Sequence, residues 1–350
     1  MIKKNAIVLS AGIGNAILMI PLLKKIKSNG LEICIILNSV FINKEFIEFN
    51  NFPCDEIIEL SKFNKLKFIV NNFKRFDKMF LDYSSSSVRN ILLSTLVSNK
   101  VIVMRKNHLY LPKVFYINEK KDTHAAVLNL QLFDNEYKES DFDISELELT
   151  LKNTDKPDII RKIESAKKNP VVVQLSSANL KAPYKNWPVN SWILFMNDIS
   201  LKFPNLHLIL MGDENEIVFG KQIKNEVKGN VTNLIGKTDL IEMCSILYHS
   251  KFYIGLDSGL MHLAVAYNIP TFSIFGASSY HFVGYDKFDN KKHKVIYNPI
   301  SCWPCHGFSQ TNRLKVKKPS DCQDFSCLKG LEPDKVFLLF LNFYNSAFSI

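Results

Sequence analysis

Apolar positions in the first part of the chain alternate between short continuous runs and longer stretches with helical spacing. Residues 6–10 and 32–37 are apolar runs of strand length, and residues 15–27 between them carry apolar side chains at helical intervals. The alternation continues with an expected strand at 78–81, a helix at 88–97 and a strand at 101–104. Strands that are apolar almost throughout are typical of a parallel sheet covered by helices.

A second alternating series follows a charged stretch, poor in aromatic residues, between residues 139 and 170. We expect the interdomain link at 152–168. The expected strands beyond it are 171–175, 206–211, 231–234, 252–255 and 271–275, and the expected helices are 189–203, 215–227, 239–249 and 260–267. The pattern predicts two successive doubly wound α/β domains, 1–155 and 156–332, and a C-terminal helix at 333–350 that crosses back and packs on the N-terminal domain.

Composition and charge narrow the class of protein. With 350 residues, 47% hydrophobic and 22% charged, the chain is neither disordered, collagen-like nor a disulfide miniprotein. No uninterrupted run of 18 apolar residues occurs, and Gly12, Gly14 and Asn15 interrupt the N-terminal apolar segment, so we interpret that segment as a core strand and not as a signal peptide. The net charge of +10 favours anionic partners, but no block of five basic residues exists, so we expect no nucleic-acid partner.

The seven cysteines fall into two groups. Three lie in apolar contexts that are typical of buried free thiols in a reducing compartment, which predicts a cytoplasmic protein: Cys34, Cys54 and Cys244. The other four have two, sixteen and four intervening residues: Cys302, Cys305, Cys322 and Cys327. This spacing suits a structural tetrahedral thiolate site for zinc or iron, while free thiols and disulfides remain alternatives.

The most informative motif is a strand end, a polar turn and a helix start at residues 255–264. The backbone amides of Ser258, Gly259 and Leu260 would point out of the helix N-terminus, where the unpaired donors favour a phosphate. Asp257 or Ser258 would cap the helix, and an ordinary N-cap is the alternative interpretation. His262, one turn further on, is expected either to contact phosphate or to be a satisfied core histidine.

Two further loops follow expected strands. Ser176 and Ser177 stand at a strand end with Lys185 a few residues later, a combination that can hold the anionic half of a nucleotide, although a solvated loop lysine is the alternative. Gly12 and Gly14 form only part of a dinucleotide fingerprint, because an isoleucine replaces the third glycine. Nicotinamide binding is therefore a poor interpretation.

In this order the motifs resemble bacterial glycosyltransferase family 9, which includes the lipopolysaccharide heptosyltransferases. The resemblance rests mainly on residues 235–240 with Glu242, on 255–264, and on Pro270 with 275–278. Weaker similarity extends from about residue 5 to the terminal helix, and its residues are Pro21, Asp82 with the serines after it, Arg89, His124, Asn129, Leu130, Lys185, Trp187 and Pro188.

The resemblance implies a GT-B enzyme with two facing Rossmann-like domains, the first binding the acceptor and the second an ADP-sugar such as ADP-heptose. It implies inverting, metal-independent transfer to a lipopolysaccharide, lipooligosaccharide or other surface glycan, with the protein in the cytoplasm or peripheral at the inner membrane. Carried onto this chain, it places the diphosphate at Lys185, Ser258, Gly259 and Leu260, hydroxyl contacts at Ser176 and Ser177, Asp257 beside the nucleotide loop, and Glu242 near the ribose.

One position departs from the family. The first glycine loop of the family carries an aspartate regarded as the general base, whereas this chain has Asn15 there. An amide cannot accept the proton of the acceptor hydroxyl. Asp82 is the leading substitute, ahead of His108 and His124, and a structural aspartate is the alternative. Two other classes therefore stay open: a silent nucleotide-sugar-binding protein, and a GT-B epimerase or hydrolase.

Overall fold

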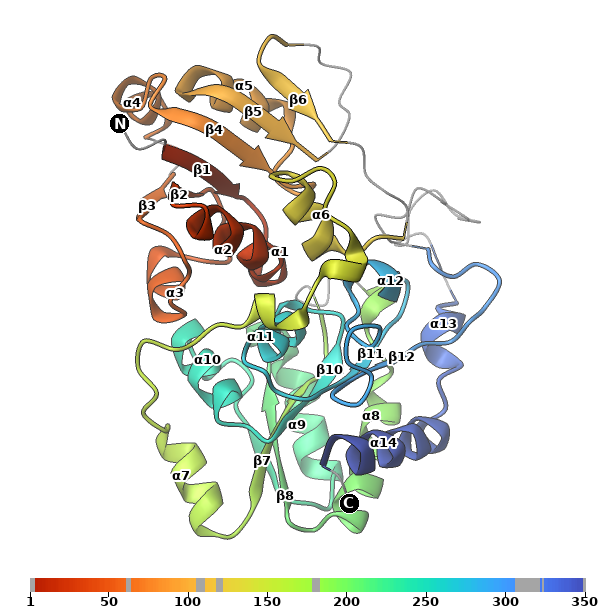
Figure 1. The fold of residues 1–350 in the computed structure, drawn as a ribbon. Helices are drawn as coiled ribbons and strands as arrows, with labels where there is room; N and C mark the ends of the chain where they lie inside the picture. The colour runs from red at the N-terminus through yellow and green to blue at the C-terminus, as the bar shows by residue number, and fades with distance from the viewer. Residues whose placement is uncertain are drawn as a thin grey trace. The chain divides into compact units, whose positions relative to one another are not determined.

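The computed structural model describes residues 4–60, 64–104, 111–117, 122–177, 183–305, 322 and 324–348. The chain divides into two compact units, residues 1–152 and 153–350 (Figure 1). The division falls three residues before the domain end that the pattern predicts at 155.

The first unit is built on a parallel sheet in the order β3-β2-β1-β4-β5-β6. Its strands are β1 (Lys4–Leu9), β2 (Glu32–Leu37), β3 (Glu56–Glu59), β4 (Phe76–Leu81), β5 (Ser98–Val103) and β6 (Val114–Tyr116). Its helices are α1 (Ile13–Leu18), α2 (Ile20–Ser28), α3 (Lys44–Phe49), α4 (Lys65–Asn71), α5 (Val88–Val97) and α6 (Ala125–Gln131), with short 3₁₀ turns at η1 (Glu139–Asp141) and η2 (Ile144–Leu147). The register of β1 with β2 is unbroken, from Lys4 opposite Glu32 to Leu9 opposite Leu37.

The second unit repeats this order, as β12-β11-β10-β7-β8-β9. Its strands are β7 (Asn169–Gln174), β8 (Leu206–Met211), β9 (Val231–Asn233), β10 (Phe252–Leu256), β11 (Thr271–Ile274) and β12 (His293–Ile296). Its helices are α7 (Asp158–Ser165), α8 (Val189–Lys202), α9 (Ile217–Glu226), α10 (Leu240–Tyr248), α11 (Gly259–Ala266), α12 (Tyr280–Val283), α13 (Ser326–Lys329) and α14 (Pro333–Phe348), with 3₁₀ turns at η4 (Pro183–Lys185) and η5 (Glu214–Glu216). The prediction of two doubly wound α/β domains is confirmed.

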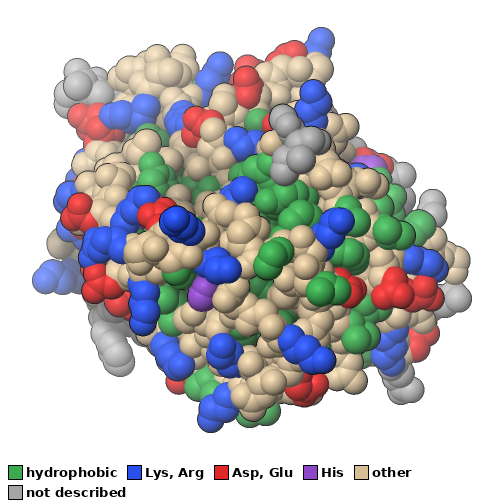
Figure 2. Space-filling model, turned by 90° about the horizontal axis from the view of Figure 1, so that it is seen from below, with side chains coloured by type: hydrophobic (Ala, Val, Ile, Leu, Met, Phe, Trp, Pro, Cys, Tyr) green, Lys and Arg blue, Asp and Glu red, His purple; other side chains and the backbone are tan. Residues whose placement is uncertain are grey.

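Charged side chains are mixed on the surface seen in Figure 2. On that face Lys and Arg lie singly or in small groups among Asp, Glu and uncharged side chains. The view agrees with a sequence in which basic residues occur mostly alone or in pairs.

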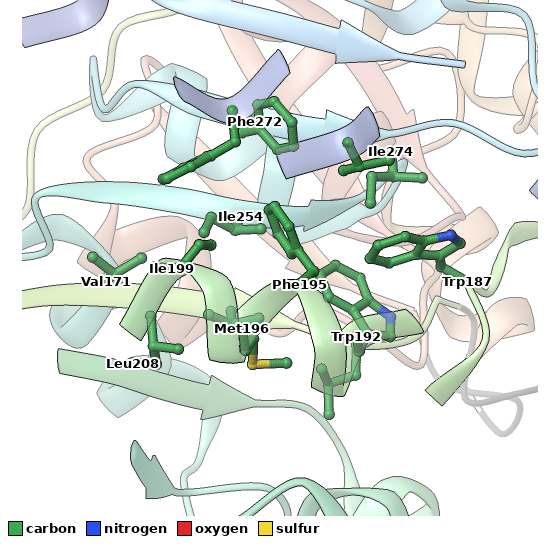
Figure 3. Close-up of a cluster of buried hydrophobic side chains, with 14 of the residues drawn as sticks. Val171, Trp187, Trp192, Phe195, Met196, Ile199, Leu208, Ile254, Phe272 and Ile274 are labelled. Carbon is green, nitrogen blue, oxygen red and sulfur yellow. The ribbon is translucent and has the colours of Figure 1, made fainter. Parts of the chain in front are cut away.

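The core of the second unit lies between its sheet and helix α8 (Figure 3). Phe195 of α8 is fully buried against Phe272 of β11, with ring centroids 6.0 Å apart, and Trp187 and Trp192 close the cluster at one side. Close packing of this kind places the strand ends at defined positions.

The C-terminal helix α14 belongs to this same core. Phe340 meets Phe195 at a centroid distance of 5.7 Å, and Phe343 and Tyr344 are buried beside it. This differs from the expectation that the helix packs on the N-terminal domain. Aromatic side chains three and four residues apart form one face of a helix, and α8 and its sheet bury that face.

Other differences from the predicted elements have local causes. The single helix expected at 15–27 is broken between α1 and α2, because Pro21 lacks an N–H donor and because Asn129 Nδ2 donates to the Leu18 carbonyl at 2.9 Å. Helix α7 lies in the expected link, where it buries only Ile160 and Ile163. Strands β3, β6 and β12, of three or four residues, have no counterpart among the predicted strands, whereas β9, an outer strand of three residues, does.

Candidate functional site

Two loops of the second unit lie where the strand order reverses, between β7 and β10. Open α/β sheets bind ligands at the carboxyl ends of strands at such a point. Ser177 Oγ donates to the Asp257 carbonyl at 3.0 Å, and the Ser177 N–H donates to Asn186 Oδ1 at 2.9 Å. These bonds bring the predicted serine loop and the predicted phosphate loop together.

Lys185 extends from η4 and pairs with Asp257. The Nζ–Oδ2 distance is 2.6 Å, and the side chains are 21% and 7% exposed. The turn that carries Lys185 is held because the Ala277 N–H donates to the Tyr184 carbonyl at 3.1 Å. Burial alone would raise the pKa of Asp257, but the charge of Lys185, that of His262 once it is protonated at low pH, and hydrogen bonds from Lys185 and Ser278 outweigh it, so that pKa is lowered. An ammonium has three donors and the pair uses one, which leaves two for an anion.

The N-terminus of α11 lies directly after Asp257. Ser258 is the N-cap and its Oγ accepts from the Met261 N–H at 3.4 Å. The N–H groups of Gly259 and Leu260, in the first turn, have no intrahelical acceptor. The capping interpretation and the phosphate interpretation are therefore compatible, because the cap uses a different amide.

A buried hydrogen-bond network fixes the loop that contains Ser258. Tyr253 Oη donates to Gln174 Oε1 at 2.8 Å, and Ser258 Oγ donates to the same oxygen. Gly255 makes room for the phenol, because a Cβ at that position would lie 2.1 Å from Tyr253 Oη. The loop geometry is thus set in part by Gln174 and Tyr253, which are not among the residues predicted to contact the ligand.

His262 is buried one turn into α11, with Nδ1 2.6 Å from Tyr285 Oη. Burial lowers the pKa of His262 to about 4; Asp257 raises it and Lys185 lowers it. The imidazole is therefore neutral at physiological pH. It belongs to the core and also lies within electrostatic reach of the Lys185–Asp257 pair.

This depressed pKa predicts acid sensitivity. Because the pKa of His262 is lower in the folded protein than the 6.5 of an unfolded chain, its contribution to stability is complete above pH 6.5 and is lost as pH falls toward 4. In His262→Gln, the loss of unfolding free energy between pH 6.5 and pH 4 should be smaller than in the parent by about 3 kcal/mol. Urea unfolding at several pH values measures this, and parallel curves for the two proteins would contradict it.

Glu216, at the end of η5, is a buried carboxyl group that sequence reasoning missed. Burial raises the pKa of Glu216 to about 7, and hydrogen bonding by Ser176 partly opposes that rise. Its Oε2 lies over Gly212, where a Cβ would come within 2.6 Å. The signal in the sequence was the acidic run that directly follows a buried strand next to β7.

Glu242 is placed differently from the other predicted donor contacts. It is exposed, and its carboxylate accepts from the Asp239 N–H at 3.0 Å while Asp239 caps the Glu242 N–H at 2.8 Å. This is a capping box at the start of α10. The structure does not bring Glu242 into contact with Lys185 or Ser258.

The corresponding reversal point of the first unit carries Asn15. Gly12 is the N-cap of α1, and nothing lies within 4 Å of where its Cβ would be. Gly14 and Asn15 are in the first turn and are partly exposed. Ser10 Oγ donates to the Ser84 carbonyl at 3.3 Å, so the loop before Asn15 adjoins the loop that follows β4.

Asp82 begins that second loop and is buried. Its carboxylate accepts from Ser84 Oγ at 2.7 Å, from the Ser85 N–H at 2.9 Å and from Ser85 Oγ. These bonds hold the serine turn and orient the carboxylate. His124 is the buried N-cap of α6, which gives it a structural position, and His108 lies outside the described residues.

All seven cysteines are free thiols, so the disulfide alternative is wrong for this structure. Cys305 Sγ lies 3.1 Å from the Cys302 carbonyl. Burial, and then the neighbouring thiols Cys302, Cys327 and Cys322, raise the pKa of Cys305 to about 12. Among the described residues, no group of three or more His, Cys, Asp or Glu side chains is arranged to hold a metal ion.

No helix in the described part of the chain is long and apolar enough to cross a membrane.

Comparisons with known proteins agree with this arrangement. Residues 91–316 match the family model described as glycosyltransferase family 9 (heptosyltransferase). The chain is 25% identical over 336 residues to lipooligosaccharide heptosyltransferase 2 of Campylobacter jejuni, with 93% of each chain covered. Among solved structures, Escherichia coli ADP-heptose lps heptosyltransferase II is similar with a TM-score of 0.70 and 16% identity over 98% of this chain and 99% of that one. The iron-containing dodecameric glycosyltransferase TibC from enterotoxigenic E. coli is similar with a TM-score of 0.57 and 14% identity over 99% of this chain and 78% of that one.

Proposed function

Because the chain belongs to glycosyltransferase family 9, we propose that it transfers a heptose or related sugar from an ADP-linked donor to a lipooligosaccharide, lipopolysaccharide or other surface-glycan acceptor. The name of the Campylobacter relative supports the acceptor class, and that of the E. coli structure supports the donor. We assign the donor to the second unit and the acceptor to the first.

The observation that carries the proposal is the Lys185–Asp257 pair beside the N-terminus of α11. The two remaining ammonium donors and the amides of Gly259 and Leu260 suit a diphosphate. His262, which is neutral and buried one turn into α11, is the third group that we assign to the diphosphate. We assign Ser176 and Glu216, whose carboxyl pKa is raised by burial, to hydrogen bonds with sugar hydroxyls.

We propose an inverting displacement at the anomeric carbon. The acceptor oxygen forms a bond to that carbon from the face opposite the leaving group, the bond to the diphosphate oxygen breaks, and the hydroxyl proton passes to a base. Lys185 and the helix amides stabilise the negative charge that develops on the diphosphate. Because Asn15 cannot take the proton, we assign that step to Asp82, on the adjoining loop.

Turnover of ADP-heptose with and without a lipooligosaccharide acceptor tests the proposal. Transfer that requires acceptor is expected. Release of ADP without acceptor would instead indicate a hydrolase or epimerase, and tight donor binding without turnover would indicate a silent binding protein.

We propose a structural zinc or iron at the four C-terminal cysteines, mainly on their spacing of two, sixteen and four intervening residues. Cys302, Cys322 and Cys327 all lie within electrostatic reach of Cys305 and disfavour its thiolate. A cation would relieve that mutual repulsion, and four thiolates are the donor set that zinc or iron prefers. Bound there, the metal would have a structural role and take no part in the transfer.

Metal analysis of the purified protein tests this assignment. About one zinc or iron per chain is expected, as a four-thiolate site requires, and Cys302→Ser/Cys305→Ser should remove it. The matched control Cys54→Ser, a cysteine of the first unit, should retain the metal. A metal content near zero in the parent, with four titratable thiols, would contradict the site.

A further inference from the structure

Two neighbouring helices of the first unit expose apolar side chains in rows. Leu66 and Val70 of α4, and Phe73 just after it, point outward at intervals of four and three residues, and Val88, Leu92 and Leu96 of α5 do so at intervals of four. Each of the six is between 43% and 76% exposed. Residues at these intervals share one face of a helix, so the exposure is organised and not scattered.

The two rows belong to one outer surface. Phe68 of α4 and Ile91 of α5 are buried in the same cluster on one face of the sheet, so both helices cover that face. The turn after α4 touches the end of α5, because the Lys74 N–H donates to the Leu96 carbonyl at 3.2 Å. We name the six exposed residues together the α4–α5 surface.

The segment that forms this surface holds all of the protein's excess charge. Residues 61–121 contain 13 Lys and Arg against three Asp and Glu, a net charge of +10, while the rest of the chain is balanced. Lys67, Lys74 and Arg89 are exposed next to members of the two rows, and Asp82 is buried in its loop. Apolar rows are thus combined with a basic rim.

The second unit provides a contrast. Helices α8 and α14 also expose leucines, among them Leu194, Leu201 and Leu338. There, however, acidic and basic side chains are mixed: Lys202 follows Leu201, and Asp334 is close enough to Asp198 to add to the effect of burial, which raises the pKa of Asp198. The exposed leucines of α8 and α14 therefore lie on helices whose acidic and basic residues balance, Asp198 with Lys202 and Asp334 with Lys335.

We propose that the α4–α5 surface binds an anionic phospholipid bilayer. The aliphatic side chains would enter the boundary between head groups and acyl chains, and the lysines would lie against the lipid phosphates. A second copy of this surface is disfavoured because two regions of like charge would face each other, and nucleic acid would leave the leucine and valine rows without an apolar partner. The assignment goes beyond the proposed function, since it requires no particular donor or acceptor.

Vesicle sedimentation of the full chain tests the proposal. We expect binding to phosphatidylglycerol vesicles that weakens with salt, and weak binding to phosphatidylcholine vesicles. Lys67→Gln/Lys74→Gln should lower the partition coefficient about 25-fold, since each lysine near such a surface contributes about fivefold. Leu92→Ser/Leu96→Ser should lower it about tenfold through lost apolar insertion. Leu194→Ser/Leu201→Ser, the matched control on α8, should bind as the parent does.

Thermal unfolding and transfer to a detergent-solubilised acceptor distinguish this inference from the proposed function. The α4–α5 variants should keep the parent's unfolding temperature and its rate with soluble acceptor, because the substituted side chains are exposed and lie outside the candidate site. No vesicle binding by the parent, equal binding to both lipids, or equal losses in the α8 control would overturn the inference. A dimer of the parent that dissociates in Leu92→Ser/Leu96→Ser would also overturn it, in favour of a self-interface. Absence of transfer alongside intact vesicle binding would count against the proposed function alone.

Discussion

Asp82→Asn is expected to lower the rate of sugar transfer by roughly 10²- to 10⁴-fold and to leave donor affinity unchanged. The expectation follows from Asn15, an amide at the position where the family carries its base, and from the hydrogen bond between Ser10 and Ser84 that joins the two loops. Three hydrogen bonds from the serine turn hold the Asp82 carboxylate in a single orientation. Steady-state rates over a range of pH measure the effect.

Ser84→Ala is the matched control, because it removes one donor to Asp82 and keeps the carboxylate. If Asp82 is the base, Ser84→Ala should be much more active than Asp82→Asn, and only Asp82→Asn should lose the acidic limb of the kcat/KM profile. Equal losses in both variants, with equally lowered unfolding temperatures, would instead show that Asp82 only holds the loop.

Asn15→Asp complements that experiment. It restores the carboxylate at the family's position, where Gly12 leaves open space in front of the helix. Activity should rise or stay unchanged. If the parent transfers to no acceptor and Asn15→Asp does, the parent is a silent binding protein.

Lys185→Ala should weaken ADP binding about 10- to 100-fold, as expected when a charge-assisted contact of about 1.5 to 3 kcal/mol is lost. It also leaves Asp257 buried without its partner, so the free energy of unfolding should fall. Lys185→Ala/Asp257→Asn removes the unpaired charge and should recover part of the stability but not the affinity. Calorimetric titration with ADP and urea unfolding measure the two effects separately.

Lys221→Ala, an exposed lysine of α9, is the control for a general effect of charge and should bind ADP as the parent does. Unchanged ADP affinity in Lys185→Ala would remove Lys185 from the donor site. The assignment of the Gly259 and Leu260 amides to the diphosphate would then lose its main argument, which is the neighbouring Lys185 charge.

The sequence by itself determined the fold class and predicted the loops that we assign to the donor. Most of the central strands are apolar runs, and most are followed by a helix with an apolar face, so local pattern and tertiary packing agree. The turn at Asp257, Ser258 and Gly259 was also visible, because a polar turn between a buried strand and an apolar helix has a local signature. The departure at Asn15 was also visible in the sequence, because it requires only that the residue at this position be compared with the family's aspartate.

Only the tertiary structure decided which groups meet. The pairing of Lys185 with Asp257, 72 residues later, and the support of Ser258 by Gln174 and Tyr253 depend on strand order, which no local pattern encodes. A carboxylate such as that of Glu242 suits a ribose contact, but in the structure it accepts a hydrogen bond from the Asp239 N–H. The buried carboxyl of Glu216 appeared only in the structure, because burial is a property of the packed sheet. The spacing of aromatic residues in α14 was evident in the sequence. Only the structure shows that this face packs against α8 and the sheet of the second unit.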